Sequence, residues 1–485
     1  MKKMTALLLV ISLLLASCGV SDISEVPEPE ETAEVEVYKA NNDVFGVAFA
    51  PSESADPYTT PNKLNSELAG LICEPLFALS QSFEPEPVLC SDYTHNDKVY
   101  VFKIRSATFS DGSALRASDV EYSLKCAMES GSYYAARLSL IESISSSNRN
   151  GTVTIRLRYD NSRLPALLDI PIIKSGTRAD KLPTGTGIYA PKEDFSALVA
   201  RNGHHSGKTP PYSVITLYDI TSSDELVFEF DSHNISILTG DPTGTSKSTP
   251  SSGAESIPVP TTQMHYLGFN LRDEALKDAA TRAAIARAID RESIAQSDFA
   301  LMGVAAALPI HPASKLYSED AASALSYDGK TQISVSKPLE ILVNSENSGK
   351  LAACKRISET LTRLGVVTTV RALPFAEYNA ALAKGDFTLY YGEVALGADF
   401  DITRLVAGSL NYGWIYDGGM SSALLSYLAG DEALSDYCGY FCKFVPFAPI
   451  MFKNSVMYSD RNFFEKATPT SQNVYNGFCD WVILK

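Results

Sequence analysis

The chain has no cluster of lysine and arginine of the kind that a nucleic-acid-binding protein needs. Its 41 Lys and Arg residues are outnumbered by 57 Asp and Glu residues, which gives a formal net charge of −16 at pH 7. Because phosphate groups are recognised by clustered basic side chains, we expect no nucleic-acid partner. Solubility is the simplest explanation of the acidic excess.

The sequence also lacks a complete catalytic motif. It contains no G-x-S-x-G sequence, which is the nucleophile turn of α/β-hydrolases. The glycine-rich segment 203–209 has three residues between its glycines, whereas a P-loop has four. Residues 334–337 have the S-x-x-K spacing of penicillin-binding enzymes, but the companion motifs are missing. We therefore predict that the chain is not an enzyme.

Histidine is scarce, with six residues, but His204 and His205 are adjacent. Imidazole nitrogens are common ligands of transition metals and of haem iron, so this pair is a candidate metal or haem site. If the pair lies on a strand, however, neighbouring side chains point to opposite faces. On that assumption we predict no metal and no cofactor.

No hydrophobic run is long enough to span a bilayer. Two lysines precede an apolar run from Ala6 to Ala16, which is shorter than the ~20 residues that a membrane helix needs. A basic start before a short apolar core predicts a signal peptide over 1–17. The sequence Leu-Ala-Ser-Cys ending at Cys18 resembles a bacterial lipobox, so we predict a lipid on Cys18 that anchors the protein outside the cytoplasm. Residues 18–36, rich in Glu and Pro, are predicted to be a flexible tether.

The number of cysteines does not allow all of them to form disulfides if Cys18 is lipidated. If Cys18 carries a lipid, seven of the eight cysteines remain, and an odd number cannot all pair within one chain. Cys73 and Cys90 are candidates for a loop disulfide. The alternative, which we favour, is that the seven are isolated small buried side chains.

The stretch 99–128 has the pattern of a strand, a turn and a capped helix. Tyr100, Phe102 and Ile104 alternate with Val99, Val101, Lys103 and Arg105, which is typical of a half-buried strand. The Asp-Gly pair at 111–112 predicts a turn. Ser118 is the predicted N-cap of the following helix, and Glu121 completes a capping box.

This stretch closely resembles the signature of the family-five extracellular solute-binding proteins, the receptors for oligopeptides, dipeptides and nickel chelates that supply ABC importers. In that family a strand similar to YTFKLR is followed by F-x-D-G-x-x-L-x-A-x-D-V-x-Y-S-L. The matching positions here are Tyr100–Arg105, Phe109, Asp111, Gly112, Leu115, Ala117, Asp119, Val120 and Tyr122–Leu124. A second match joins Met264–Asn270 (MHYLGFN) to the alanine-rich segment 279–295, which contains an Ile-Asp-Arg sequence.

The resemblance implies an α/β fold, a two-lobed clamshell like the periplasmic binding proteins, with mixed sheets and an extra N-terminal subdomain. The ligand should lie in the cleft between the lobes. The segments that cross between the lobes are expected to form a hinge at Gly268, Phe269 and Asn270. The expected divisions are 37–70, 184–262 and 455–485 for lobe I, 71–183 for the inserted subdomain, and 263–454 for lobe II.

The residues of lobe II support a partly parallel sheet independently of the resemblance. Strand candidates at 339–343 and 366–371 flank an amphipathic helix at 351–364, which Gly365 closes. This strand–helix–strand order predicts a right-handed crossover between parallel strands.

The resemblance also implies where a ligand binds. In peptide-binding members, an Asp in an Ala-Asp-Tyr type sequence meets the α-ammonium group of the peptide, and Asp399 stands at that place. Its alternative role is that of a capping or surface residue. Asn411, Tyr412 and Trp414 are further candidate ligand contacts, because aromatic side chains offer large rigid surfaces. Core packing is the alternative for Trp414.

We therefore predict a monomeric, membrane-anchored receptor that captures short peptides and delivers them to an ABC permease. The same fold with a non-peptide ligand, such as a nickel complex, haem, a sugar or an opine-like solute, is the alternative. We favour the hypothesis that the chain is an enzyme less than either binding-protein hypothesis.

Overall fold

The computed structural model describes residues 44–243, 249–250, 253–460 and 464–483, all within the unit Ala40–Lys485. The predicted signal peptide, the tether and Cys18 lie outside the described residues. Among the described helices, none combines the length and the apolar character that a membrane crossing requires.

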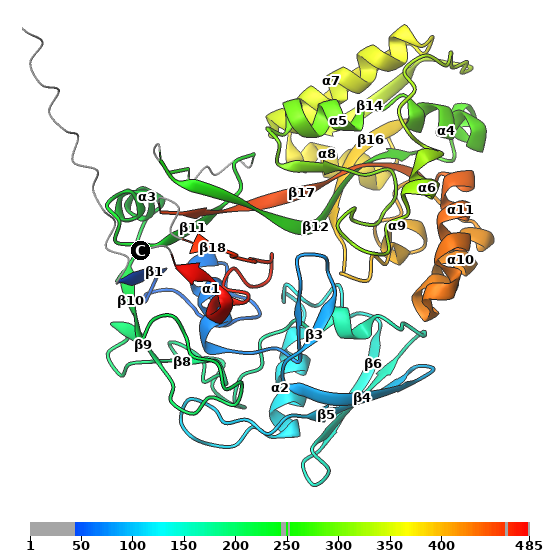
Figure 1. The fold of residues 1–485 in the computed structure, drawn as a ribbon. Helices are drawn as coiled ribbons and strands as arrows, with labels where there is room; N and C mark the ends of the chain where they lie inside the picture. The colour runs from blue at the N-terminus through cyan, green and yellow to red at the C-terminus, as the bar shows by residue number, and fades with distance from the viewer. Residues whose placement is uncertain (1–43, 244–248, 251–252, 461–463, 484–485) are drawn as a thin grey trace, which may run out of the picture. The chain divides into compact units, whose positions relative to one another are not determined.

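The largest sheet extends from lobe I into lobe II (Figure 1). Its seven strands are β11 (Ile237–Gly240), β12 (Glu255–Phe269), β13 (Gly303–Ala305), β14 (Leu339–Asn344), β15 (Thr368–Leu373), β16 (Leu389–Ala395) and β17 (Phe447–Ser459). The order is β11-β17-β12-β16-β14-β15, and β13 pairs with β17. β12 is antiparallel to both of its neighbours, whereas β14 is parallel to β15 and β16. The predicted partly parallel sheet is therefore confirmed.

The helices α4 to α11 lie between β12 and β17 in the sequence. They are α4 (Ala279–Arg287), α5 (Arg291–Ser293), α6 (Glu319–Ser323), α7 (Ser348–Arg363), α8 (Phe375–Lys384), α9 (Thr403–Val406), α10 (Gly418–Ala429) and α11 (Leu434–Phe444). The helix predicted between the parallel strands is α7, whose N-cap Asn347 accepts a hydrogen bond from the Lys350 backbone N–H at 3.0 Å. Gly365 has a φ of +102°, a left-handed conformation that favours glycine, where the chain leaves this helix.

Lobe I has a smaller sheet of four strands. These are β1 (Phe45–Phe49), β10 (Val214–Asp219), β9 (Ala197–Ala200) and β8 (Tyr189–Pro191), in that order. β1 and β10 are parallel, and the other pairs are antiparallel. Two helices, α1 (Lys63–Ile72) and α3 (Ser223–Asp231), and a short hairpin of β18 (Phe464–Glu465) with β19 (Val482–Ile483) complete this part.

The inserted subdomain contains an antiparallel sheet. Its strands in order are β4 (Cys90–Asn96), β5 (Val99–Ile104), β7 (Thr152–Leu157) and β6 (Ile141–Ser147), and a hairpin joins β2 (Phe77–Leu79) to β3 (Pro85–Pro87). The predicted strand at 99–105 is confirmed as β5, with Tyr100 and Phe102 fully buried. The subdomain shares one hydrophobic core with lobe I, because Tyr100 and Phe45 of β1 belong to the same buried cluster.

The helix cap predicted at Ser118 is wrong. Helix α2 (Ala117–Ala127) begins earlier, and the Asp119 carboxylate accepts a hydrogen bond from the Arg116 backbone N–H at 2.9 Å. Asp119 therefore takes the role predicted for Glu121, which instead pairs with Lys125 at 2.6 Å. Both Asp119 and Glu121 can cap a helix start, so the sequence pattern alone did not separate the two registers.

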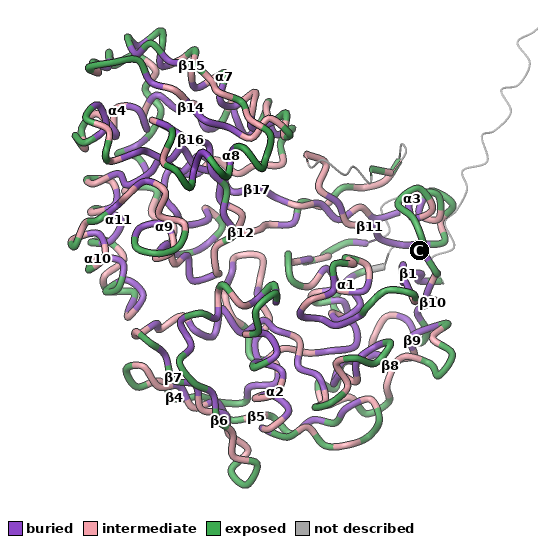
Figure 2. Tube along the Cα trace, turned by 180° about the vertical axis from the view of Figure 1, so that it is seen from behind, coloured by how far each residue is buried: buried purple, intermediate pink, exposed green. Residues whose placement is uncertain are grey.

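Two long strands connect the cores of the two lobes. β12 and β17 pair along most of their length, with a register shift between Val259 and Gln263. Val259 belongs to the lobe I core, and Met264, further along the same strand, belongs to the lobe II core. Figure 2 shows that β17 is buried along most of its length. The crossing thus lies at 259–263, where the strand pairing is irregular.

The residues of the predicted hinge do not lie at this crossing. Gly268 packs so closely on Tyr390 that a Cβ there would be 2.0 Å from the tyrosine ring. Phe269 is fully buried in the lobe II core. The Asn270 side chain donates a hydrogen bond to the Phe387 carbonyl at 2.9 Å. These three residues are fixed inside lobe II. The matched sequence marks the end of β12 at Phe269 and the residue after it, and not the crossing.

The cysteines within the described residues form no disulfides. All seven described cysteines are free, so the candidate disulfide between Cys73 and Cys90 is absent. Five of the seven are buried, which agrees with isolated buried side chains.

One buried arginine in the matched alanine-rich segment binds the backbone of lobe II. Arg282 is 1% exposed. Its guanidinium donates hydrogen bonds to four carbonyl oxygens, those of Leu276, Lys277, Phe444 and Val445. Arg282 thereby joins the start of α4 to the end of α11.

We predict that Arg282→Met lowers the free energy of unfolding by about 3 kcal/mol or more. The substitution leaves buried carbonyls without a donor, at about 1–3 kcal/mol each. Arg287→Met on the same helix is the control, with an expected loss of about 1 kcal/mol or less. Chemical denaturation of both variants is the measurement, and equal losses would contradict the role assigned to Arg282.

Candidate functional site

A cavity of about 530 Å³ lies between lobe II and the inserted subdomain. One wall is the segment 393–405, which includes the end of β16 and the loop after it, and Thr262 lies beside it at the crossing. The side chains used below are Tyr133, Arg137, Tyr159, Asp169, Asp399, Asp401 and Arg404. The cavity therefore offers contacts from both sides of the crossing strands.

Asp399 lies in an irregular loop that packing holds in place. The neighbouring Phe400 has a φ of 55°, and its ring packs on Phe83 and Phe452 with centroids 5.6 and 6.1 Å away. At Gly397, a Cβ would lie 2.4 Å from Asp399 Oδ1, so a larger residue there would displace the Asp399 side chain. The backbone thus fixes Asp399 at the cavity wall.

The Asp399 side chain is 2% exposed and hydrogen-bonded on both oxygens. Oδ2 accepts from Asn161 Nδ2 at 2.8 Å, and Oδ1 accepts from the Asp401 backbone N–H at 3.3 Å. Burial, and then the nearby Asp401 carboxylate, raise the pKa of Asp399 to about 6. An ionised carboxylate has about four lone-pair sites, so these two bonds leave room for a further donor.

Asp401 is the second carboxylate of this wall. Its Oδ2 accepts a hydrogen bond from the Tyr159 hydroxyl at 2.8 Å, and its Oδ1 accepts one from the Thr403 backbone N–H at 2.7 Å. Among the ion pairs of the described residues, none contains Asp399 or Asp401. The wall therefore carries two carboxylates with neutral hydrogen-bond partners and no paired cation.

The inserted subdomain brings a cation to the same cavity. Arg137 Nη2 lies 2.5 Å from Asp169 Oδ1, and the guanidinium carbon is 4.9 Å from the centroid of the Tyr134 ring. Burial raises the pKa of Asp169, and the Arg137 charge opposes that shift. Arg404 also lines the cavity. One cavity thus holds both a carboxylate pair and guanidinium groups.

The other predicted ligand contacts lie elsewhere. Asn411 uses its side chain to close a turn, accepting from the Ile415 N–H and donating to the Ile415 carbonyl, both at 2.8 Å. Trp414 stacks on the Arg272 guanidinium, 3.4 Å from the ring centroid. Tyr412 packs against the lobe II core. None of these three lines the cavity that contains Asp399.

Sequence reasoning missed the subdomain side of the cavity. Asn161 and Asp399 are hydrogen-bonded although they are 238 residues apart in the chain. Asn161, Tyr159 and Arg137 lie in no motif that marked them. Only the fold brings them to Asp399.

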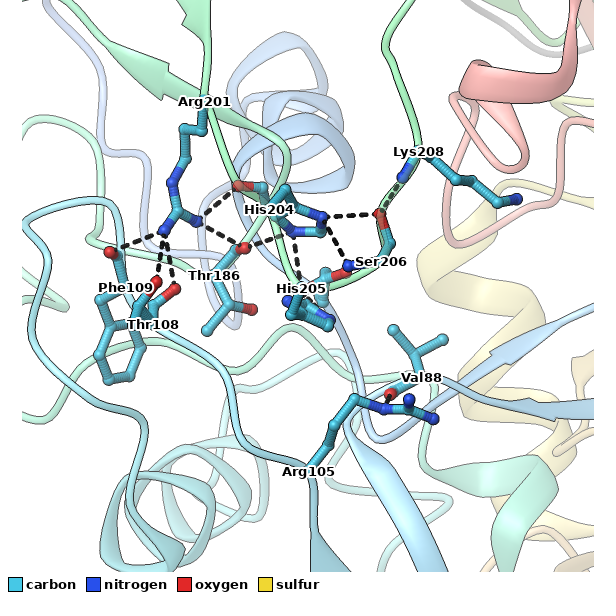
Figure 3. Close-up of polar contacts among 12 residues, drawn as sticks. Val88, Arg105, Thr108, Phe109, Thr186, Arg201, His204, His205, Ser206 and Lys208 are labelled. Carbon is cyan, nitrogen blue, oxygen red and sulfur yellow. Dashed lines mark hydrogen bonds and ion pairs between the residues drawn. The ribbon is translucent and has the colours of Figure 1, made fainter.

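A second, larger cavity of about 970 Å³ contains the two adjacent histidines. His204 and His205 lie in a turn between Gly203 and Gly207, whose φ angles are 70° and 67°. Figure 3 shows the two rings beside each other, and their centroids are 4.2 Å apart. The assumption that they lie on a strand with opposed side chains is therefore wrong. Burial lowers the pKa of His205.

The sequence was compared with protein families and with known proteins. A family model described as bacterial extracellular solute-binding proteins, family 5 Middle, matches residues 84–404. A Brucella ovis protein named as an ABC transporter peptide-binding protein is 25% identical over 371 aligned residues. That alignment covers 66% of this chain and 66% of the relative, so the chain spans just under two thirds of the relative's length.

Solved structures show the same fold. The ABC transporter substrate-binding protein CtaP from Listeria monocytogenes has a TM-score of 0.68 at 15% identity, covering 91% of this chain and 99% of CtaP. NikZ from Campylobacter jejuni, solved with Ni(L-His), has a TM-score of 0.59 at 17% identity, covering 91% of this chain and 99% of NikZ. The predicted two-lobed α/β fold is confirmed.

The raised pKa of Asp399 predicts how stability depends on pH. The folded protein holds this proton up to pH about 6, whereas the unfolded chain releases it near pH 4. The stability that this proton contributes is therefore present below pH about 4 and lost as the pH rises through 6. Asp399→Asn removes this dependence.

We predict that the wild type loses stability relative to Asp399→Asn as the pH rises from 4 to 7. The difference in free energy of unfolding between the two proteins should change by about 2 kcal/mol in favour of Asp399→Asn. Denaturation curves at both pH values measure it. Asp180→Asn, at an exposed position, is the control. A difference independent of pH would show that the Asp399 pKa is not raised.

Proposed function

This chain belongs to the bacterial extracellular solute-binding proteins of family 5, and from that premise we propose that it captures short peptides in the cavity around Asp399. The resemblance recognised from the sequence is thereby confirmed. The single observation that carries the proposal is the pair of carboxylates, buried Asp399 and half-buried Asp401, at the wall of a cavity with no cation paired to them among the described residues.

An ammonium group supplies the missing charge. At ~4 Å from a carboxylate it gains about 4 kcal/mol at an effective dielectric constant of 20, before the cost of desolvation. A second carboxylate nearby adds to this attraction. The amino terminus of a peptide is such a group, and Asp399 has unused lone pairs to receive it.

The guanidinium groups of the cavity fit the other end of the same ligand. Arg404 lines it together with Asp399 and Asp401, and Arg137 lines it as the ion-pair partner of Asp169. A short peptide carries an ammonium group at one end and a carboxylate at the other. Tyr133 and Tyr159 offer rigid aromatic surface to the side chains between them.

Capture is proposed to proceed by movement of the lobes. A ligand in this cavity touches the inserted subdomain on one side and lobe II on the other. Binding then favours the arrangement in which both walls meet the ligand. We place the bend at 259–263, where β12 loses regular pairing with β17, in place of Gly268–Asn270.

The remaining steps follow from the family. The closed protein would be recognised by an ABC permease in the membrane, with no covalent chemistry. We propose that it acts outside the cytoplasm as a monomer held to the membrane by a lipid on Cys18. Asn411, Tyr412 and Trp414 stay predictions, and no part of this proposal depends on them.

A nickel complex is the second candidate ligand. NikZ, which shares the fold, was solved with Ni(L-His). The paired histidines favour this alternative, but they lie in the other cavity. Dependence of binding on Asp399 and on a free amino terminus separates the two ligand classes.

The test is equilibrium dialysis against a library of short peptides, with bound peptides identified by mass spectrometry. We predict that the wild type retains peptides with free amino termini. Asp399→Asn should reduce their retention by at least about 30-fold, because a buried charge pair loses one partner.

Two controls accompany this experiment. Asp180→Asn should bind as the wild type does, and the same library acetylated at its amino termini should not be retained. Retention of acetylated peptides, or equal retention by Asp399→Asn, would contradict the proposed ammonium site.

A further inference from the structure

Three potential metal ligands converge in the 970 Å³ cavity, outside the cavity of Asp399. Glu74 follows α1, and its Oε2 lies 3.6 Å from His204 Nε2 and 3.4 Å from His205 Nε2. Ligand atoms from all three side chains lie within 4.8 Å of one another. Residues 130 positions apart in the chain are thus brought to one point.

The carboxylate oxygen at this point is buried without a hydrogen bond. Glu74 Oε2 has no hydrogen-bond partner among the described residues. An unsatisfied buried acceptor of this kind is costly unless something binds it. A cation placed between the carboxylate and the two imidazoles would remove that cost.

Two of the three ligand separations match the coordination sphere of a transition metal, and the third is no longer than 4.8 Å. Ligand atoms about 2.1 Å from a tetrahedral ion lie about 3.4 Å apart. The two Glu74–histidine distances, 3.4 and 3.6 Å, are close to this value. Two imidazoles and a carboxylate suit Zn²⁺, Ni²⁺, Co²⁺ or Cu²⁺ better than Mg²⁺ or Ca²⁺, which prefer oxygen.

We propose that Glu74, His204 and His205 bind one divalent first-row transition metal ion. Three protein ligands leave at least one coordination position open, as in non-structural zinc sites. The three residues line the large cavity, so a water or a small oxygen ligand has room to complete the sphere. This site is independent of the proposed peptide function.

Neighbouring groups already hold His204 in place (Figure 3). Its Nδ1 lies 2.8 Å from Ser206 Oγ, and its Nε2 lies 2.9 Å from the Thr186 carbonyl oxygen. Metal binding through Nε2 requires the ring to turn away from the Thr186 carbonyl and its proton to move to Nδ1. Ser206 Oγ can accept that proton, and the Ser206 backbone N–H, which donates to Nδ1 at 3.3 Å, gives up this bond. The Thr186 carbonyl keeps a donor, because Arg201 Nη1 binds it at 2.8 Å.

The positive charge of Arg201 opposes a cation here, but it is directed elsewhere. Its guanidinium donates to the Thr186 and Gly187 carbonyls and to oxygens of Thr108 and Phe109. Glu74 supplies the one formal negative charge of the ligand set. Selectivity is therefore expected for ions that bind imidazole strongly, and weak or no binding for Mg²⁺.

The test is calorimetric titration of the full chain, made without a histidine tag and stripped with a chelator, with ZnCl₂, NiCl₂ and MgCl₂ separately. We expect one Zn²⁺ or Ni²⁺ per chain and no Mg²⁺. Loss of an outer-shell partner weakens metal binding by about 10–100-fold, and Ser206→Ala should weaken it by about 10-fold. Glu74→Gln and His205→Ala remove ligands and should weaken metal binding by more than about 100-fold.

His95→Gln is the matched control, since His95 lies in β4 with Asp160 as its partner, and it should bind as the wild type does. Circular dichroism checks the fold of each variant. If a variant does not fold, paramagnetic Co²⁺ added to the wild type should broaden the imidazole NMR signals of His204 and His205. Absence of one-to-one binding, undiminished binding by folded Glu74→Gln and His205→Ala, or broadening only at other histidines would overturn the proposal.

Discussion

The antiparallel pairing of β12 with β17 joins the two lobes of the molecule. Both strands pass from the core of lobe I, at Val259 and Met457, into the core of lobe II, at Met264 and Phe452. Their backbone hydrogen bonds hold the two lobes in one fold although each lobe has its own buried cluster. The register shift after Val259 is the one place along the pairing where the strands leave lobe I and enter lobe II.

The pairing of β12 with its neighbours also positions the walls of the cavity around Asp399. β16 pairs with β12, and the chain leaves its end as the loop that carries Asp399 and Asp401. The inserted subdomain, which shares its core with lobe I, supplies Tyr159 and Arg137 to the opposite side, and its Asn161 donates a hydrogen bond to Asp399. A charged and hydrogen-bonded cavity therefore lies where the two lobes meet, and its chemistry comes from residues of both.

Local patterns predicted the fold well where one element depends on its own residues. Alternation identified β5, and the strand–helix–strand order identified the parallel strands β14 and β15. Prediction failed where neighbouring residues compete for one role, as when Asp119 rather than Glu121 completes the cap of α2. It failed again at His204 and His205, because flanking glycines in left-handed conformations make a turn instead of a strand.

The candidate sites were less accessible to sequence reasoning than the fold. Asp399 was marked by a motif, but its partner Asn161 is 238 residues away and belongs to no pattern. Likewise, nothing in the neighbourhood of Glu74 indicated that two histidines would reach it. Contacts of this kind are determined by how the strands and the subdomain pack, which a linear pattern does not contain.

We propose that a solute is captured between two lobes that move about the β12–β17 crossing, which makes the protein more compact when the ligand is bound. Small-angle X-ray scattering of the protein, with and without a saturating short peptide that has a free amino terminus, measures this change. We expect a smaller radius of gyration with peptide than without. An unchanged radius of gyration at proven saturation would show that the lobes do not close on the peptide.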